Sequence, residues 1–303
     1  MKIGITGATG FIGRHFIRYA QGAGHEVVAY SRNPHGLPVL LASKTLRQLA
    51  SAPHELPETR LDALVHLAGE SLMGLWTRSK CDRVWKSRVD YTQALVRHLR
   101  SWSPDNRPQS LVCASGTGFY GDRGVEELDE TSSSGAGFLA RLCVEWESAA
   151  KQAGEFGSRV VNLRTGMVLG ADGAAFPLLR RVFGLGLGGR LGNGRQWMPW
   201  IHVEDAARLI LSAVEDTRFR GPLNLVAPQA VTNAEFTQTL AQTLKRPAWF
   251  HVPALALRLV LRGMADEMLL GSQRVNPRVA LESGYRFLHP TLPGCLAALL
   301  NQD

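Results

Sequence analysis

Short apolar runs alternate with helical patterns over the first two thirds of this 303-residue chain. Runs of four or five apolar residues are typical of strands buried on both faces, and they lie at residues 2–6, 26–30, 64–67, 110–114 and 160–164. Helical spacing of apolar residues fills 13–21, 84–100 and 139–153 between them. The alternation predicts an α/β fold with a doubly wound parallel sheet and right-handed crossovers.

The pattern changes beyond about residue 170. Glycine and arginine crowd into residues 184–194, and mixed helices and turns follow. We therefore expect two parts without a flexible linker between them. Residues 1–170 hold most of the sheet, and residues 171–303 complete it and form a smaller mixed cap, interleaved at the carboxyl edge of the sheet.

The composition indicates a globular protein whose stability does not depend on disulfide bonds or a structural metal. The chain is 45% hydrophobic, and its 31 Gly and 15 Pro are too few for a low-complexity protein. The four cysteines, Cys81, Cys113, Cys143 and Cys295, are far apart, and none belongs to a CxxC pair or a Cys/His group with metal-ligand spacing. We expect reduced, mostly buried thiols and no metal site.

The formal net charge of +8 raises the question of a nucleic-acid or membrane partner. The basic residues are spread along the whole chain, however, and their longest run is the pair Arg180 and Arg181. The longest apolar segment, residues 252–261, contains Pro253 and Arg258 and is about half as long as a membrane span. Because no secretory signal precedes the first strand, we expect a cytoplasmic protein that binds neither nucleic acid nor membrane.

The first expected strand ends in Thr6-Gly7-Ala8-Thr9-Gly10-Phe11-Ile12-Gly13, and a helix follows at once. A dinucleotide pyrophosphate needs backbone N–H groups at a helix N-terminus and no intruding side chain. In this GxxGxxG spacing Gly7 makes the tight turn, Gly10 permits the close approach and Gly13 lets the helix pack on the sheet. The strand before and the helix after supply the context that a glycine motif requires. We expect a dinucleotide site that also includes Thr9, Phe11 and Ile12.

The end of the second expected strand decides between the two nicotinamide dinucleotides. A site for NAD places Asp or Glu there to bind the ribose, whereas a nearby arginine suits the 2′-phosphate of NADP. This chain has Ser31 and Arg32 and no carboxylate. We expect NADP(H) to be preferred over NAD(H); the alternative interpretation of Arg32 is a solvated surface arginine.

Three motifs resemble those of the extended short-chain dehydrogenase/reductases, which include nucleotide-sugar epimerases and dehydratases: TGATGFIG at 6–13, VHLAGE at 65–70 and ASGTGFYGD at 114–122. Residues 138–147, 197–205 and 224–233 resemble more narrowly the YfcH-like epimerase-family branch. The resemblance covers nearly the whole chain. It implies a Rossmann domain with about seven strands, a dinucleotide across its carboxyl edge, and a C-terminal cap for a small-molecule substrate that is anionic or nucleotide-linked. The resemblance does not decide whether the protein forms a homodimer.

The same resemblance indicates further cofactor contacts at the ends of the later strands and on one helix. These residues are Leu67, Ala68, Gly69, Glu70, Arg88, Ala114, Ser115, Arg164, Thr165 and Gly166. The alternative interpretation of Arg88 is a charge on the helix surface.

The catalytic pair of the wider family is missing from this chain. Those enzymes carry Tyr-x-x-x-Lys, in which the lysine lowers the pKa of the tyrosine so that the phenol transfers a proton while nicotinamide transfers hydride. No tyrosine of this chain has a lysine four positions later; the matching positions hold Phe138 and Leu142, and the family's Ser/Thr position holds Gly116.

Two interpretations follow from this loss. In the first, the protein is an oxidoreductase or epimerase with a rebuilt proton-transfer site, for which the leading candidates are Tyr120, Thr117 and Ser115, and further ones are Cys143, Glu145, Glu70 and His202. Tyr120 is alternatively a packing residue. In the second interpretation the cofactor site is kept and the chemistry is lost, which leaves an NADPH-binding regulatory or scaffold module.

Overall fold

The computed structural model describes residues 1–31, 45–49, 52 and 55–301. Its centre is a seven-stranded sheet in which every pairing is parallel, with the strand order β12-β7-β5-β4-β1-β2-β3. The strands are β1 (Lys2–Thr6), β2 (Glu26–Ser31), β3 (Thr45–Leu49), β4 (Ala63–His66), β5 (Ser110–Gly116), β7 (Arg159–Thr165) and β12 (Gly221–Leu225). The predicted α/β fold with a doubly wound parallel sheet of about seven strands is confirmed.

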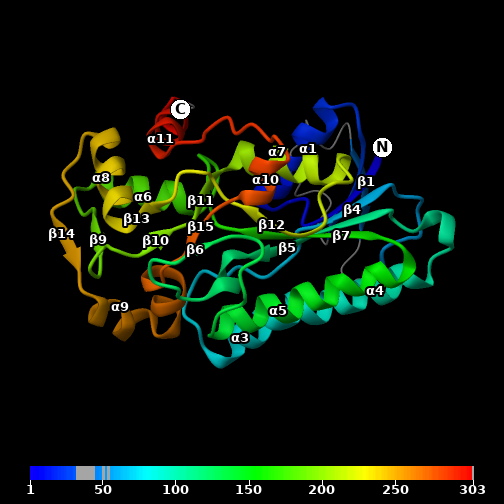
Figure 1. The fold of residues 1–303 in the computed structure, drawn as a ribbon, viewed down its shortest axis with the longest axis horizontal. Helices are drawn as coiled ribbons and strands as arrows, with labels where there is room; N and C mark the ends of the chain where they lie inside the picture. The colour runs from blue at the N-terminus through cyan, green and yellow to red at the C-terminus, as the bar shows by residue number, and fades with distance from the viewer. Residues whose placement is uncertain (32–44, 50–51, 53–54, 302–303) are drawn as a thin grey trace.

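Helices cover both faces of this sheet (Figure 1). On one face lie α1 (Phe11–Gly22), α7 (Val203–Glu215) and α10 (Arg278–Glu282), and on the other α3 (Arg78–Trp85), α4 (Tyr91–Ser101) and α5 (Phe138–Lys151). Alternate strand residues enter the two helix layers: Ile3 and Val65 pack in the core beneath α1 and α7, whereas Leu64 packs in the core beneath α4 and α5. Burial on both faces is the reason that the strands appear in the sequence as continuous apolar runs.

Smaller elements form the end of the molecule beyond the carboxyl edge of the sheet (Figure 1). Four short pairs are β8 (Met167–Leu169) with β11 (Trp200–His202), β10 (Trp197–Met198) with β13 (Val231–Thr232), β14 (Phe250–Val252) with β9 (Gly189–Leu191), and β15 (Arg274–Val275) with β6 (Glu127–Leu128). The helices here are α6 (Ala175–Gly184), α8 (Asn233–Leu244), α9 (Ala254–Leu261) and α11 (Leu292–Leu300). Trp200, Phe236 and Leu296 lie in the core cluster that joins α6, α8 and α11.

The long helix expected over residues 84–100 is broken into pieces. It runs as α3, a π-helical turn η3 (Lys86–Asp90) and α4. The remaining short helical turns are η4 (Pro104–Asn106), η5 (Thr117–Tyr120), η6 (Gln152–Phe156) and η7 (Ala265–Leu270). A π turn is often found at a functional site because it redirects side chains, and this one carries Arg88.

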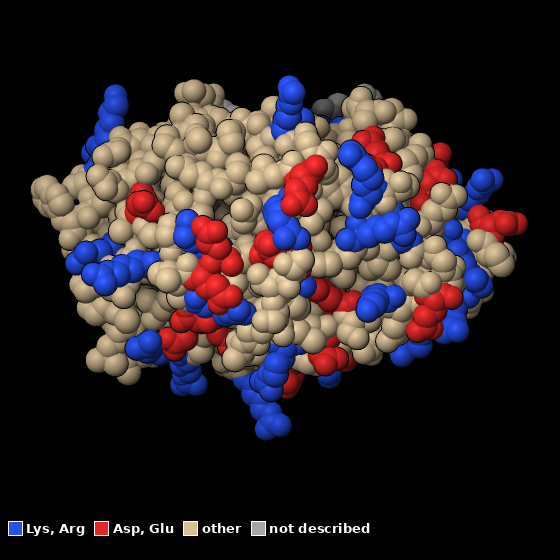
Figure 2. Space-filling model, in the orientation of Figure 1, with Lys and Arg blue, Asp and Glu red and all other residues tan. Residues whose placement is uncertain are grey.

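Surface charge and thiols agree with the sequence analysis. On the face shown in Figure 2, Lys and Arg side chains are interspersed with Asp and Glu, and no continuous basic surface forms there. All four cysteines are free thiols. Among the described residues, no helix has the length and apolar content that crossing a membrane requires.

Candidate cofactor site

The glycine turn lies between the end of β1 and the start of α1. Gly7 has φ +77°, and a Cβ there would lie 2.7 Å from the carbonyl carbon of Leu67. A Cβ on Gly13 would lie 2.3 Å from the carbonyl oxygen of Gly7. Only glycine fits these two positions, because the chain after β1, the chain after β4 and the first turn of α1 touch through their backbones.

The N-terminus of α1 is left open to a ligand. Its N-cap is Gly10, no side chain caps the helix, and its first turn holds no acidic residue. The Gly10 N–H donates to the Gly7 carbonyl at 3.0 Å, which closes the turn and leaves the following N–H groups at the helix end. Such an end attracts an anion through its exposed donors and its dipole.

The neighbours of Gly10 hold this turn in place. Arg14 Nη1 donates to the Thr9 carbonyl at 2.8 Å. The Phe11 ring packs where Cβ atoms on Gly170 and Gly173 would be, within 2.5 and 2.7 Å, and Ile12 packs against the core. Thr9, Phe11 and Ile12 therefore have structural roles at the turn in addition to the expected cofactor contact.

Arg88, in η3, extends its side chain to the loop that follows β4. Its guanidinium carbon would be 3.3 Å from a Cβ on Gly69, and it stacks over the ring of Trp146 at 5.3 Å. Its Nη1 donates to the Ser87 hydroxyl at 3.3 Å, and no carboxylate among the described residues forms an ion pair with it. Burial lowers its pKa below the usual range, but an arginine this basic stays charged at neutral pH. A half-buried cation without an ion-pair partner among the described carboxylates, close to the glycine turn, fits an anionic group of a ligand.

Glu70 and Lys80 pair with each other at the same loop. Lys80 Nζ donates to Glu70 Oε1 at 2.8 Å, and Arg83 Nε lies 3.7 Å from the same oxygen. The hydrogen bond from Lys80 holds the pKa of Glu70 below its usual range. Glu70 is therefore a carboxylate at neutral pH and orders the loop that follows β4.

A buried polar network joins β5, β7 and α5. The Glu147 carboxylate accepts hydrogen bonds from Nε and Nη2 of Arg164, each at 2.9 Å, and from the Ser115 hydroxyl at 2.8 Å. Burial alone would lower the pKa of Arg164, but the hydrogen bonds and charge of Glu147 outweigh it and leave that pKa above its usual range. Arg164 Nη1 also donates to the hydroxyl of Tyr120 at 3.1 Å, and its guanidinium lies over the Phe119 ring. We expected Arg164 at the cofactor, but its donors are directed to protein groups.

Tyr120 is fully buried. Its hydroxyl donates to Asn224 Oδ1 at 2.7 Å and lies 3.0 Å from the carbonyl of Asp129. Burial raises its pKa to about 12 although Arg164 lies beside it. The hydroxyl donates to Asn224 and accepts from Arg164, so protein groups occupy the positions at which a substrate would bind it. The structure therefore favours the packing interpretation of Tyr120 over the catalytic one.

Apolar groups fill the position of the missing catalytic pair. Phe138 packs edge-on against Trp76 at 5.5 Å between ring centroids, and Leu142 is buried. The Cys143 sulfur lies 3.8 Å from a Cβ placed on Gly116, and burial raises the pKa of this thiol to about 11. Cys143 is thus a neutral thiol at physiological pH.

The other predicted residues follow the strand ends. Thr165 donates to the carbonyl of Leu163 at 3.1 Å, and Gly166 packs against the backbone of Pro199. Thr117 is buried in η5, and Ala114 packs partly buried against the core. Ser31 ends β2. Arg32, on which the NADP(H) preference rests, lies outside the described residues.

Three functional neighbours were missed by sequence reasoning. Glu147 joins Ser115 to Arg164; Glu130 accepts the backbone N–H of Asn224 at 3.0 Å; and Glu267 accepts those of Phe138 and Leu139 at 2.8 and 2.6 Å. Glu147 lies four residues after Cys143 on the expected helix. This spacing places both residues on the same helix face and could have indicated that Glu147 is near the site. The partners of Glu130 and Glu267 lie 94 or more residues away in the chain, so spacing could not show them.

Comparison with known proteins places these features in a family. Residues 3–225 match the NAD dependent epimerase/dehydratase family. This chain belongs to that family. Residues 252–299 match DUF1731, a domain of unknown function. The Rossmann-like sheet and the glycine turn are thus features of an epimerase-family protein, and the resemblance found in the sequence is confirmed.

Similar proteins match nearly the whole chain. The epimerase family protein YfhF of Bacillus subtilis is 34% identical to this chain, over 99% of this chain and 98% of YfhF. Human SDR39U1 is 35% identical, over 99% of this chain and 100% of SDR39U1. A crystal structure of human SDR39U1 isoform 2 with NADPH has a TM-score of 0.89 at 34% identity and covers 100% of both chains. A nucleoside-diphosphate sugar epimerase structure from Corynebacterium glutamicum has a TM-score of 0.79 at 32% identity, over all of this chain and 59% of that one.

Proposed function

We propose that this chain binds NADP(H) across the carboxyl edge of the sheet and uses it as an oxidoreductase or epimerase on a small, anionic or nucleotide-linked substrate. The open N-terminus of α1 behind the Gly7–Gly13 turn carries the proposal, because it offers backbone donors and a positive dipole to a pyrophosphate. The NADPH in the similar human SDR39U1 structure supports the choice of dinucleotide. In this proposal residues 1–170 bind the dinucleotide and residues 171–303 cap the substrate.

Arg88 supplies a second anchor in this proposal. Its half-buried guanidinium lies against Gly69 and stacks on Trp146, so it is held in place before a ligand arrives. A bound anion at this point would restore the charge balance that the described carboxylates do not supply. In this proposal Arg88 supplies a positive charge near the cofactor. The catalytic lysine supplies one in the wider family.

Ser115 is the group that we propose for proton transfer. Its hydroxyl donates to Glu147 Oε1 at 2.8 Å, and Arg164 donates to both oxygens of that carboxylate. A carboxylate that accepts the proton of a hydroxyl makes its oxygen a better acceptor for a substrate proton. The dinucleotide, when bound, supplies or accepts hydride; Ser115 and Glu147 hold and move the proton.

The second candidate function is an NADPH-binding module without turnover. It is favoured by the apolar side chains of Phe138 and Leu142 at the two positions where the wider family has its tyrosine and lysine. Both candidates require the cofactor site, and they differ only in chemistry.

Gly10→Asp tests the cofactor site at little cost to the fold, since its Cβ would meet only one close atom, the Gly7 carbonyl oxygen at 3.1 Å. Aspartate is a favourable N-cap residue, so α1 keeps or gains stability while its carboxylate occupies the anion position. We expect NADPH binding, followed by fluorescence titration, to be lost at unchanged thermal stability. Gly22→Ala is the control, because a Cβ there meets nothing within 4 Å. Undiminished binding by Gly10→Asp would overturn the proposed site.

Turnover separates the two candidates. The NADPH-loaded protein is offered a panel of carbonyl compounds that includes nucleotide-linked 4-keto sugars, and the absorbance of the reduced nicotinamide is followed. We expect oxidation with at least one of them, a loss of at least tenfold in kcat for Ser115→Ala, and no change for the exposed Ser148→Ala. No oxidation by any compound, with NADPH binding intact, would leave the binding-module function.

A further inference from the structure

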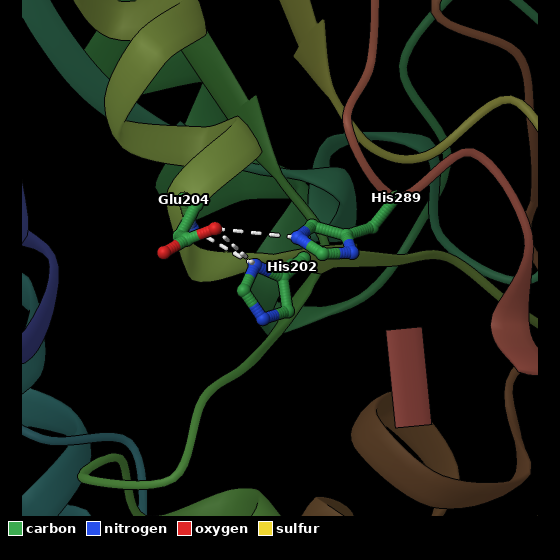
Figure 3. Close-up of side chains that lie close together, drawn as sticks. All are labelled: His202, Glu204 and His289. Carbon is green, nitrogen blue, oxygen red and sulfur yellow. Dashed lines mark hydrogen bonds and ion pairs between the residues drawn. The ribbon is translucent and has the colours of Figure 1, made fainter. Parts of the chain in front are cut away.

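Two imidazoles and a carboxylate meet outside the residues assigned to the cofactor. His202 ends β11, Glu204 lies in the first turn of α7, and His289 lies in the segment before α11. Figure 3 shows the Glu204 carboxylate facing one nitrogen of each ring. Glu204 Oε2 lies 3.3 Å from His289 Nε2 and 4.0 Å from His202 Nδ1, and the three ligand atoms all lie within 4.8 Å of one another.

We propose that His202, Glu204 and His289 bind one divalent transition-metal ion of the zinc class. Two imidazole nitrogens and one carboxylate oxygen are a common protein ligand set for zinc, with a water at the open fourth position. Tetrahedral zinc bonds of roughly 2.0–2.2 Å place the ligand atoms about 3.3–3.6 Å apart. Glu204 Oε2 and His289 Nε2 already have this separation, whereas His202 Nδ1 must approach Glu204 Oε2 from 4.0 Å.

The His202 imidazole has few partners among the described residues. His202 is wholly buried, and its Nδ1 accepts only a long hydrogen bond, 3.2 Å, from the Glu204 N–H. Its Nε2 is buried without a partner among the described residues. The His202 and His289 rings lie 3.9 Å apart between centroids. A cation bound to both rings would replace the hydrogen bond to His202 Nδ1 with a coordinate bond.

The ligands are positioned before any ion arrives. Asp205 is fully buried and accepts the backbone N–H groups of Leu288 and His289 at 2.7 and 2.8 Å, which fixes the 288–289 segment against α7. The Glu204 and His289 side chains are 31% and 16% exposed, which leaves an entry path and room for water.

The ion would link the segment before α11 to the first turn of α7. That contact already depends on Asp205, and coordination by His289 on one side and His202 with Glu204 on the other would add a second link. The expected consequence is higher stability of the metal-loaded chain, because an ion that binds only the folded state stabilises it.

Zinc titration of the whole EDTA-treated chain tests this site. Isothermal calorimetry should show one zinc per chain, cobalt should give the visible absorption of an imidazole-ligated ion, and zinc should raise the thermal midpoint. His289→Gln and Glu204→Gln should each weaken zinc binding at least tenfold. His202→Asn keeps an N-cap acceptor and should do the same.

The matched control is His25→Gln. His25 pairs with Glu215 at 2.7 Å on the surface, as His289 does with Glu204, but has no second imidazole in that pair. It should bind zinc like the unaltered chain. The proposal is overturned if no zinc binds, or if His289→Gln and Glu204→Gln bind it as tightly as His25→Gln. These measurements are made without dinucleotide, so their result is independent of the proposed function.

Discussion

Removing Glu147 should leave Arg164 as an unpaired charge in the core. The side chains of Arg164 and Glu147 are 5% and 12% exposed, and two hydrogen bonds of 2.9 Å join them. Removing one partner of a buried pair typically costs about 3–5 kcal/mol of the free energy of unfolding. Arg164 keeps Tyr120 as a hydrogen-bond partner and Phe119 as a stacking partner. We therefore expect Glu147→Leu to lose about 3 kcal/mol, at the lower end of that range.

Urea denaturation of the purified variants measures this loss. Glu145→Leu is the matched control, because Glu145 is exposed on the same helix, and a surface change of this kind should stay within about 0.5 kcal/mol. The double variant Glu147→Leu with Arg164→Met removes both charges and should recover much of the stability that the single variant loses.

Two results would refute this reasoning. A loss below about 1 kcal/mol for Glu147→Leu would mean that the pair is solvated enough to be replaced by water. A double variant no more stable than the single one would mean that the loss comes from packing and not from the unpaired guanidinium.

Three further changes have expected outcomes. Arg262→Gly should raise the free energy of unfolding by about 1 kcal/mol, because Arg262 has φ +53° with ψ −136°, a conformation that suits glycine; a lower thermal midpoint would contradict this. Gly13→Ala should destabilise the chain by about 2 kcal/mol or more, since its Cβ would overlap the Gly7 carbonyl, and an unchanged urea midpoint would contradict it. Burial lowers the pKa of His66 to about 4, below the unfolded value near 6.5, so its contribution is present above pH 6.5 and is lost as the pH falls towards 4. Urea denaturation at pH 7 and 5 should show a loss of about 2 kcal/mol from this residue, and His66→Gln should show a smaller pH dependence; equal pH dependence of the two would contradict the assignment.

The strands and the glycine turn could be predicted because their signals are local. A strand buried on both faces must be apolar throughout, and Gly7 and Gly13 are needed where backbones touch. The break in the helix over 84–100 could not be predicted, because a π turn leaves no mark in apolar spacing. It nevertheless sets the direction of Arg88.

The side-chain partners could not be predicted, because they join distant segments. Arg164 lies at a strand end, as expected, but its guanidinium forms an ion pair with Glu147 on α5. Tyr120 has the motif of its family around it, yet Asn224, 104 residues later, takes its hydroxyl. His289 lies 85 residues from Glu204 in the chain. A search for short metal-ligand spacings therefore could not find a site that includes both residues.

Binding of NADP(H) at the glycine turn is the central property proposed for this protein. Fluorescence titration of the purified chain with NADPH and with NADH measures it. We predict saturable binding of one NADPH per chain, at least tenfold tighter than the binding of NADH, and loss of that binding in Gly10→Asp. Absence of saturable NADPH binding, or tighter binding of NADH, would contradict the account.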